Sequence, residues 1–496
     1  MSLIVQLTKY LMILLMGIYS YYSFTVFRSK SKRYQKRIYI TLTMLIFLLH
    51  FVGYATLFLQ IPSMKLLVLY GGEMLLLTLV LGLYQLIYPK MPRLLLRNML
   101  MLLVVSFIML ARLNYDMAVK QVIIVAFSFL ACLLVPLVMR SRMNLRRFGW
   151  FYGFAGIGVL SLVLLVGTTK LGATNWISIA GFSVQPSEFV KLLFVLCVAA
   201  LFKEQTSFRR VCAVTFLAAV HVLLLVAQTD LGGALIFFVT YLFILYIASA
   251  NPLYLFAGLL GGSGAAMVAY RLFYHVRVRV MAWQNPFAYI DKEGYQITQS
   301  LFAIGTGGWF GMGLNRGLPT SIPVVESDFI FSAISEEFGG LFVICIILIY
   351  VSCFVMFINI ALEQEVLFYR LTAVGFAVMF IFQVFLSIGG VIKFIPSTGV
   401  TLPLISQGGS SVFATIVMFM ILQGIAMKEK KRNRDIGNKK NRKKETKEKN
   451  VGKIDAENLT MMEEYAPGAD KATYGADKST LEADKSALEA DWGGSI

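Results

Sequence analysis

Residues 231–249 read LGGALIFFVTYLFILYIAS and contain no charged side chain. An apolar run of about 20 residues has the length of a helix that crosses a lipid bilayer. Similar runs recur along most of the 496 residues, which are 58% hydrophobic and 15% charged, against roughly 25% charged in soluble domains. This composition excludes a soluble globular enzyme and a disordered chain. All five cysteines fall within apolar runs, and this placement also excludes a disulfide scaffold.

The apolar runs predict an all-α, polytopic membrane protein with about 13 transmembrane helices. The predicted spans are 4–27, 38–60, 64–88, 98–113, 117–139, 148–166, 187–203, 211–227, 231–249, 253–270, 329–358, 367–390 and 404–427. They divide the chain into an N-terminal three-span extension (1–97), a ten-span core (98–427) and a charged tail (428–496).

Basic residues predict the orientation of the spans, because Lys and Arg collect in short cytoplasmic loops. Thirteen spans place every strongly basic connection on one side of the membrane: 28–37, 89–97, 140–147, 203–210 and the start of the tail. We therefore expect a multi-pass membrane protein with its N-terminus outside and its C-terminus in the cytoplasm.

The tail 428–496 is basic at first and then acidic, and it ends in seven-residue repeats such as GADKSTL and EADKSAL. It has too little apolar content to fold by itself. Its basic part is expected to lie against anionic membrane lipid. Binding of nucleic acid is the weaker interpretation, because a basic flank after a span is an ordinary topology signal.

The predicted outer side contains the less usual features. Loop 271–328 is far longer than most membrane connections and is rich in Gly and aromatic residues. Asp328 lies where this loop re-enters the membrane, and Glu336 and Glu337 follow eight and nine residues later, about 12 Å down the helix. Spacing alone leaves open whether Asp328 caps the helix 329–358 or has a function.

Several basic residues are also expected outside, against the usual charge bias. Cations around a cavity suit an anionic substrate such as a pyrophosphate, although they could instead pair with outer carboxylates. Glu188 and Lys191, three residues apart, share one helix face and are the clearest such pair.

Five stretches together resemble the SEDS family, the polytopic proteins of bacterial shape, division and sporulation (RodA, FtsW and SpoVE). They are NWISIAGFSVQPSEFVKLLFVL (175–196), QTDLGGA (228–234), NPFAYIDKEGYQITQSLFAIGTGGWFGMGL (285–314), ESDFIFSAISEEFGG (326–340) and IPSTGVTLPLISQGGSS (395–411). The resemblance covers about residues 98–427. The chain departs from common family residues at Glu326-Ser327, at Gln407 and at Ser387.

The resemblance implies a peptidoglycan glycosyltransferase that polymerises lipid II, an undecaprenyl-pyrophosphate disaccharide-peptide, at the outer face of the membrane. By motif position, Asp328 corresponds to the family's essential aspartate and is the expected catalytic residue. Trp176, Glu188 and Lys191 match other sensitive positions. Arg277, Arg279 and Arg316 join Lys191 as candidates to stabilise the departing diphosphate. Arg277 and Arg279 need not face the same way.

No metal-ligand spacing and no cofactor motif is evident, although Mg²⁺ or Mn²⁺ riding on the diphosphate is an alternative role for Asp328. The family also implies a class B penicillin-binding transpeptidase as partner. Two other functions fit many spans with buried charges: a lipid II flippase, and a noncatalytic scaffold of the cell-wall machinery. The polar motifs gather on the outer side and show no internal repeat, which favours the enzyme. The ten-span core is expected to carry this chemistry by itself.

Overall fold

The computed structural model describes residues 2–429 except 30, 142–143, 171–172, 180–181 and 203–205; the side chains of 2–4, 170, 173, 179 and 182 are also left out. The predicted tail contact with lipid therefore lies outside the described residues. The labelled α-helices are α1 (Ser2–Arg28), α2 (Lys32–Gln60), α3 (Met64–Ile87), α4 (Arg93–Leu113), α5 (Tyr115–Cys132), α6 (Val135–Arg140), α7 (Gly149–Val166), α8 (Ser187–Leu201), α9 (Phe208–Ala227), α10 (Leu231–Ser249), α11 (Pro252–Leu272), α12 (Tyr274–Gln284), α13 (Tyr295–Gly307), α14 (Ile330–Phe338), α15 (Gly340–Leu362) and α16 (Leu367–Val391). A last helix spans Gly409–Glu429.

The prediction of an all-α polytopic membrane protein is confirmed. Within the described residues, 12 helices are long and apolar enough to cross a membrane. The expected span 187–203 is the exception, because α8 has 15 residues and is about 22 Å long, shorter than the apolar core of a bilayer. Span 117–139 consists of two consecutive helices, α5 and α6.

The expected span 329–358 was wrong as one helix. It forms α14 and α15, which meet at Gly339. Gly339 has φ +83°, a left-handed conformation that favours glycine. A Cβ there would lie 2.3 Å from the backbone nitrogen of Gly311, so the break also admits a second chain segment. Glu336 and Glu337 consequently stand at the end of a nine-residue helix.

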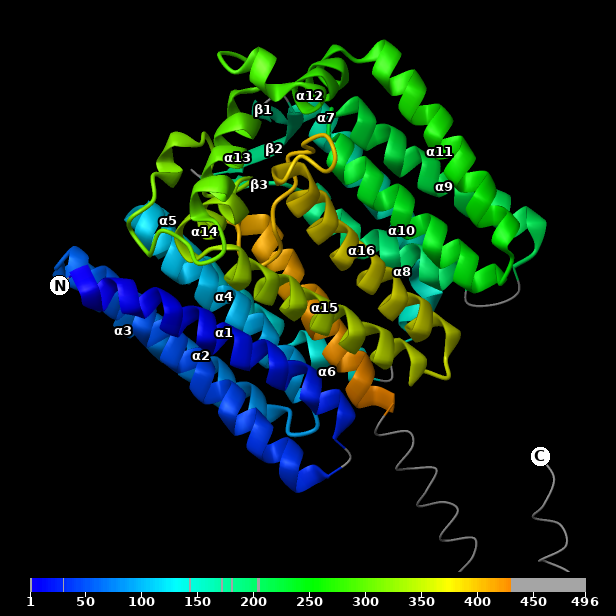
Figure 1. Cartoon of the computed structure of the whole chain (residues 1–496). Helices are drawn as coiled ribbons and strands as arrows, with labels where there is room; N and C mark the ends of the chain where they lie inside the picture. The colour runs from blue at the N-terminus through cyan, green and yellow to red at the C-terminus, as the bar shows by residue number, and fades with distance from the viewer. Residues whose placement is uncertain are drawn as a thin grey trace, which may run out of the picture. The chain divides into compact units, whose positions relative to one another are not determined.

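Helix α4 lies at the centre of the bundle, and all its residues from Leu94 to Leu110 are buried. A helix that is apolar around its whole circumference is typical of such a position. Figure 1 shows α1, α2 and α3 along one side of the bundle and α11 along the opposite side. The extension is therefore packed on the core, with α1 against α15 and α2 against α4.

Local sequence determines where the neighbouring helices α10 and α11 begin and end. Asp230 accepts a hydrogen bond from the backbone N–H of Gly233 (2.8 Å) and caps α10. Ala250 adopts a left-handed conformation with φ 52° and ends α10. Asn251 then caps α11, whose first residue is Pro252, a favoured position for proline.

One end of the bundle carries all the non-helical elaboration. Residues 168–184 form three short antiparallel strands, β1 (Thr168–Lys170), β2 (Ala173–Ile179) and β3 (Phe182–Val184), which the sequence analysis did not predict. The long loop 271–328 contains α12, α13 and the 3-10 helices Pro286–Tyr289 and Pro319–Ser321. In Figure 1 the strands, α12, α13, α14 and the gold loop before the last helix gather at this end, here called the site end.

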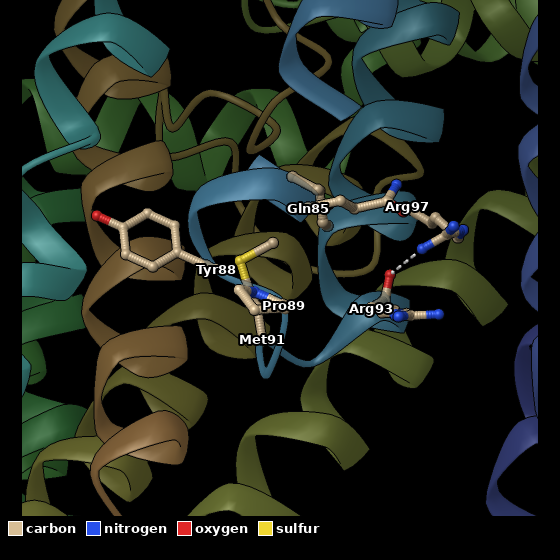
Figure 2. A pocket seen from close by; sticks show the side chains of 7 residues that line it. Gln85, Tyr88, Pro89, Met91, Arg93 and Arg97 are labelled. Carbon is tan, nitrogen blue, oxygen red and sulfur yellow. Dashed lines mark hydrogen bonds between the residues drawn. The ribbon is translucent and has the colours of Figure 1, made fainter. Parts of the chain in front are cut away.

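The basic connections lie at the other end. Arg97, at the start of α4, donates to the carbonyl of Tyr39 at the start of α2 (3.0 Å) and to Thr43 Oγ1 (2.9 Å). Its Nη1 also donates to the carbonyl of Arg93, and Figure 2 shows both arginines beside a small pocket that Tyr88 and Pro89 also line. The pocket measures about 10 Å³, room for at most one water molecule. The arginine therefore links α4 to α2 at this end of the bundle.

Candidate functional site

Asp328 lies in the turn that enters α14, and it does not cap the helix. The N-cap position belongs to Phe329, and no side chain makes a cap hydrogen bond there. The cap alternative for Asp328 is therefore wrong. The carboxylate instead accepts a hydrogen bond from Ser327 and faces the charge of Arg279.

Asp328 and Arg279 converge on the backbone of Gly399. A Cβ at Gly399 would lie 3.6 Å from Asp328 Oδ2 and 3.7 Å from Arg279 Nη2. Gly399 has φ +69°, and the absence of a side chain leaves this approach open. Arg279 is held in place by a hydrogen bond from Nη1 to the carbonyl of Ser397 (3.0 Å). Asp328, Arg279 and Gly399 form the acid–arginine centre of the site.

Burial raises the pKa of Asp328, while the Ser327 hydrogen bond and the positive charge of Arg279 act in the opposite direction. Burial likewise lowers the pKa of Arg279, which Asp328 and Asp230 counteract. Arginine stays charged in proteins despite such a shift. The centre thus pairs a fixed cation with a carboxylate whose proton affinity is increased, as a general base requires.

A second polar cluster lies between α8 and α16. Lys191 Nζ donates to Glu188 Oε2 (2.8 Å) and to Gln383 Oε1 (3.0 Å). Both charged residues are buried. Gln383 Nε2 donates in turn to the carbonyl of Thr401 (3.1 Å). The expected pairing of Glu188 with Lys191 is present, and Gln383 gives the lysine a second acceptor.

Asp230 joins this second cluster to the strands. Besides capping α10, its Oδ2 accepts hydrogen bonds from Asn175 Nδ2 (3.0 Å) on β2 and from Gln185 Nε2 (3.3 Å). A cavity of about 30 Å³ lies between Asp230, Glu188, Lys191 and the backbone of Gly399. That volume holds about two or three water molecules, so a disaccharide must lie outside it.

Segment 395–411 connects the two clusters, because Ser397 and Gly399 touch the acid–arginine centre and Thr401 holds Gln383. The same segment is fixed to the turn before Asp328: Gln407 N donates to the carbonyl of Glu326 (2.8 Å), and Ser406 Oγ donates to the carbonyl of Ser327. The serine-rich and glycine-rich sequence therefore supplies both close approach and hydrogen bonds.

The structure brings some predicted residues together and leaves others apart. Arg277 and Arg279 share helix α12, where two residues of separation turn side chains to nearly opposite faces. Arg277 is exposed and lies over the ring of Tyr274 (5.9 Å), away from Asp328. Arg316 is exposed in the loop after α13, and Trp176 lies on β2 opposite Thr168.

Sequence reasoning did not single out Asn175, Gln185, Gln383, Gly399 or Thr401 as site residues. A signal existed for Gln383, since an amide within an otherwise apolar span needs a partner. Asn175, Gln185, Gly399 and Thr401 lie within the stretches quoted for the resemblance. Except for Thr401, which contacts Gln383 only 18 residues away, their roles depend on contacts between segments far apart in the sequence, which no local pattern contains.

A bundle of membrane-spanning helices with a charged site at one end defines a multi-pass membrane protein with an enzyme-like centre. A family model described as "Cell cycle protein", covering FtsW, RodA and SpoVE, matches residues 87–431. The chain therefore belongs to the FtsW/RodA/SpoVE (SEDS) family, as the sequence resemblance predicted.

Curated relatives agree with this membership. The chain is 32% identical to peptidoglycan glycosyltransferase RodA of Mycobacterium tuberculosis over 332 residues, 63% of this chain and 71% of that protein. It is 35% identical to stage V sporulation protein E of Bacillus subtilis over 54% of this chain and 75% of the relative. It is 37% identical to a probable peptidoglycan glycosyltransferase FtsW of Aeromonas salmonicida over 53% and 70%.

A solved structure gives the same answer for the fold. A chain from a peptidoglycan synthase complex that coordinates polymerization and crosslinking superimposes with a TM-score of 0.60 and 25% identity, over 68% of this chain and 98% of that one. The protein is a SEDS peptidoglycan glycosyltransferase of elongation, division or sporulation. This confirms the predicted enzyme class.

Proposed function

We propose that the protein polymerises lipid II at the outer face of the cytoplasmic membrane, with Asp328 as the general base. The observation that carries this proposal is the convergence of Asp328 and Arg279 on the open backbone of Gly399. A lipid-linked sugar diphosphate presents both a hydroxyl to deprotonate and an anion to stabilise, and this centre offers a group for each.

The reaction balances with these two groups. The acceptor hydroxyl oxygen forms a bond to the anomeric carbon of the donor and gives its proton to Asp328. The bond from that carbon to the diphosphate oxygen breaks, and the diphosphate leaves with the electron pair. Arg279, already desolvated and oriented by Ser397, meets the charge that develops on this leaving group.

Lys191 supports the same reaction indirectly, through Gln383 and the carbonyl of Thr401 that fix segment 395–401. Arg316 and Arg277 remain candidates for capturing the long diphosphate-linked substrate, since both are exposed near the site end. Trp176 offers an aromatic surface for a sugar ring on the neighbouring strand.

A divalent cation would be bound mainly by the diphosphate. No group of three His, Cys, Asp or Glu side chains suited to a metal occurs among the described residues. Asp328 would then supply one carboxylate to Mg²⁺ or Mn²⁺. The proposed partner is a class B penicillin-binding transpeptidase, which would crosslink the glycan; the similar synthase complex supports this pairing of activities.

Asp328→Asn tests the base. Asn keeps the size of the side chain but neither takes the proton nor carries charge, so lipid II polymerisation should fall by about 10²-fold or more while the protein remains folded. Purified variants are assayed for glycan chains with Mg²⁺, with Mn²⁺ and with a chelator, and thermal stability is followed in parallel.

Asp291→Asn is the matched control, because Asp291 is exposed in the same long loop and touches none of the site residues described above. Near-parental polymerisation by the Asp328 variant would end the catalytic assignment. Transfer of lipid II between leaflets without polymer would instead support a flippase.

A further inference from the structure

The first contact of interest joins the N-terminal extension to the long loop of the core. Lys9 on α1 donates from Nζ to the carbonyl of Gly311 (2.9 Å), across 302 residues of sequence. Gln60 at the end of α2 donates from Nε2 to the carbonyl of Leu314 (2.8 Å). Next to the Lys9 contact, the rings of Tyr10 and Phe310 lie 5.6 Å apart. Two helices of the extension thus contact residues 308–318, here called the bridging segment.

The bridging segment is bonded in turn to the end of α14. The backbone N–H groups of Met312 and Gly313 donate to the carbonyls of Glu336 (2.8 Å) and Glu337 (2.9 Å). The Glu336 carboxylate accepts a hydrogen bond from the backbone of Leu318 (2.8 Å). These bonds use both the backbone and the side chain of the helix terminus, so α14 and the bridging segment move together.

Glycines allow the backbones of α14 and of the loop after α13 to approach closely. A Cβ at Gly311 would lie 2.3 Å from the carbonyl oxygen of Glu337, and one at Gly307 would lie 2.1 Å from that of Ser335. Arg112 of α4 closes the other side by donating to Glu337 Oε1 (3.0 Å) and to the carbonyl of Gly317 (3.2 Å). The bridging segment is therefore packed backbone to backbone.

Asp328 lies just before the other end of this short helix. All nine residues of α14 are buried, and a helix of that length spans about 13 Å as a rigid rod. A displacement of the bridging segment therefore reaches Asp328 with little attenuation. Misplacing a reacting group by about 1 Å can lower a rate by about 10²-fold.

Further hydrogen bonds join the extension to the core helices. Tyr19 donates to Asn98 Oδ1 (3.1 Å), and Asn98 Nδ2 donates to Ser352 Oγ (3.0 Å), which links α1, α4 and α15 within the bundle. Arg97 of α4 adds hydrogen bonds to α2 at the far end of the bundle. Lys9 and Gln60 thus belong to helices that are themselves hydrogen-bonded to the core.

We infer that Lys9 and Gln60 are positioning residues for Asp328, acting through the bridging segment and α14. The extension is by this inference a working part of the glycosyltransferase rather than an addition to a core that suffices alone. The inference rests on the proposed role of Asp328 in lipid II polymerisation.

The test uses full-length protein and lipid II, with kcat and KM measured separately. Lys9→Met combined with Gln60→Leu removes both donors, and we expect kcat to fall by about 10- to 100-fold while KM for lipid II changes by less than about two-fold. Lys9→Arg in the Gln60 parent keeps a donor of similar reach and should retain most of the rate.

Lys65→Met and Gln6→Leu are the matched controls, because both side chains are exposed on the same extension and neither contacts the bridging segment. Parental kcat in the double variant would overturn the inference. So would a loss that appears equally in kcat and in folded protein, with no rescue by Lys9→Arg. Failure of the parental protein to polymerise lipid II would instead overturn the proposed function.

Discussion

The charge of Arg279 affects the pKa of Asp328 at this site. Burial pushes the carboxylate towards its neutral form, and the arginine charge pulls it back. A general base must be ionised, so activity is lost as the pH falls through the raised pKa of Asp328. The acid limb of the rate profile is therefore expected at higher pH than for an exposed aspartate.

Arg279→Gln removes the charge that lowers the pKa of Asp328. The pKa then rises further, so the acid limb of kcat should move to higher pH, and the loss of rate should be larger in acid than in alkaline buffer. The pH dependence of polymerisation measures this. Arg277→Gln is the control, since Arg277 lies on another face of α12, and an equal shift there would contradict the assignment.

The buried pair Glu188–Lys191 should matter for stability as well as for geometry. Lys191→Met leaves the Glu188 carboxylate buried without its cation, and loss of one partner of a buried pair costs about 3–5 kcal/mol of unfolding free energy. Unfolding in detergent micelles measures the change. Replacing both residues, Glu188→Leu with Lys191→Met, should destabilise less than Lys191→Met alone; a larger loss would refute the pairing argument.

Among the helices, the break between α14 and α15 depends on glycine at position 339. Gly339→Ala requires a side chain at φ +83° and puts a methyl group against the backbone of Gly311. Strain alone costs about 1–3 kcal/mol, so a clear fall in melting temperature is expected. Gly261→Ala on α11 is the control, with no atom within 4 Å of its added methyl, and its stability should be unchanged or slightly higher.

Sequence patterns predicted the long apolar helices well, because an apolar run of about 20 residues suits a membrane-spanning helix and few alternative structures. They failed at Gly339, where a short buried helix and a spanning helix read as one continuous apolar run. The strands at 168–184 were also missed, since segments of three to seven residues are too short to show a clear periodicity. Asp328 was found through the resemblance, whereas its distance from Gly399 depends on packing that no single motif encodes.

For the whole molecule, the end with the basic connections should face the cytoplasm. A reporter fused after residue 97 or after residue 430 should read cytoplasmic, and one inserted near residue 292 should read external. Glycosylation or alkaline phosphatase reporters measure this in cells. An external reading at residue 97 would remove one span from the extension and contradict the proposed orientation.

The contact between α1 and α15 also has a consequence for how the protein is made. Ser20 Oγ donates to the carbonyl of Cys345 (3.2 Å), its partner 325 residues later in the chain. At about 5–20 residues per second, synthesis separates the two by roughly 15–65 seconds. During that interval α1 is already in the bilayer while the face that will cover it has not left the ribosome. Until Cys345 has been made, α1 can therefore pack only against helices synthesised earlier, such as α2, which follows it directly.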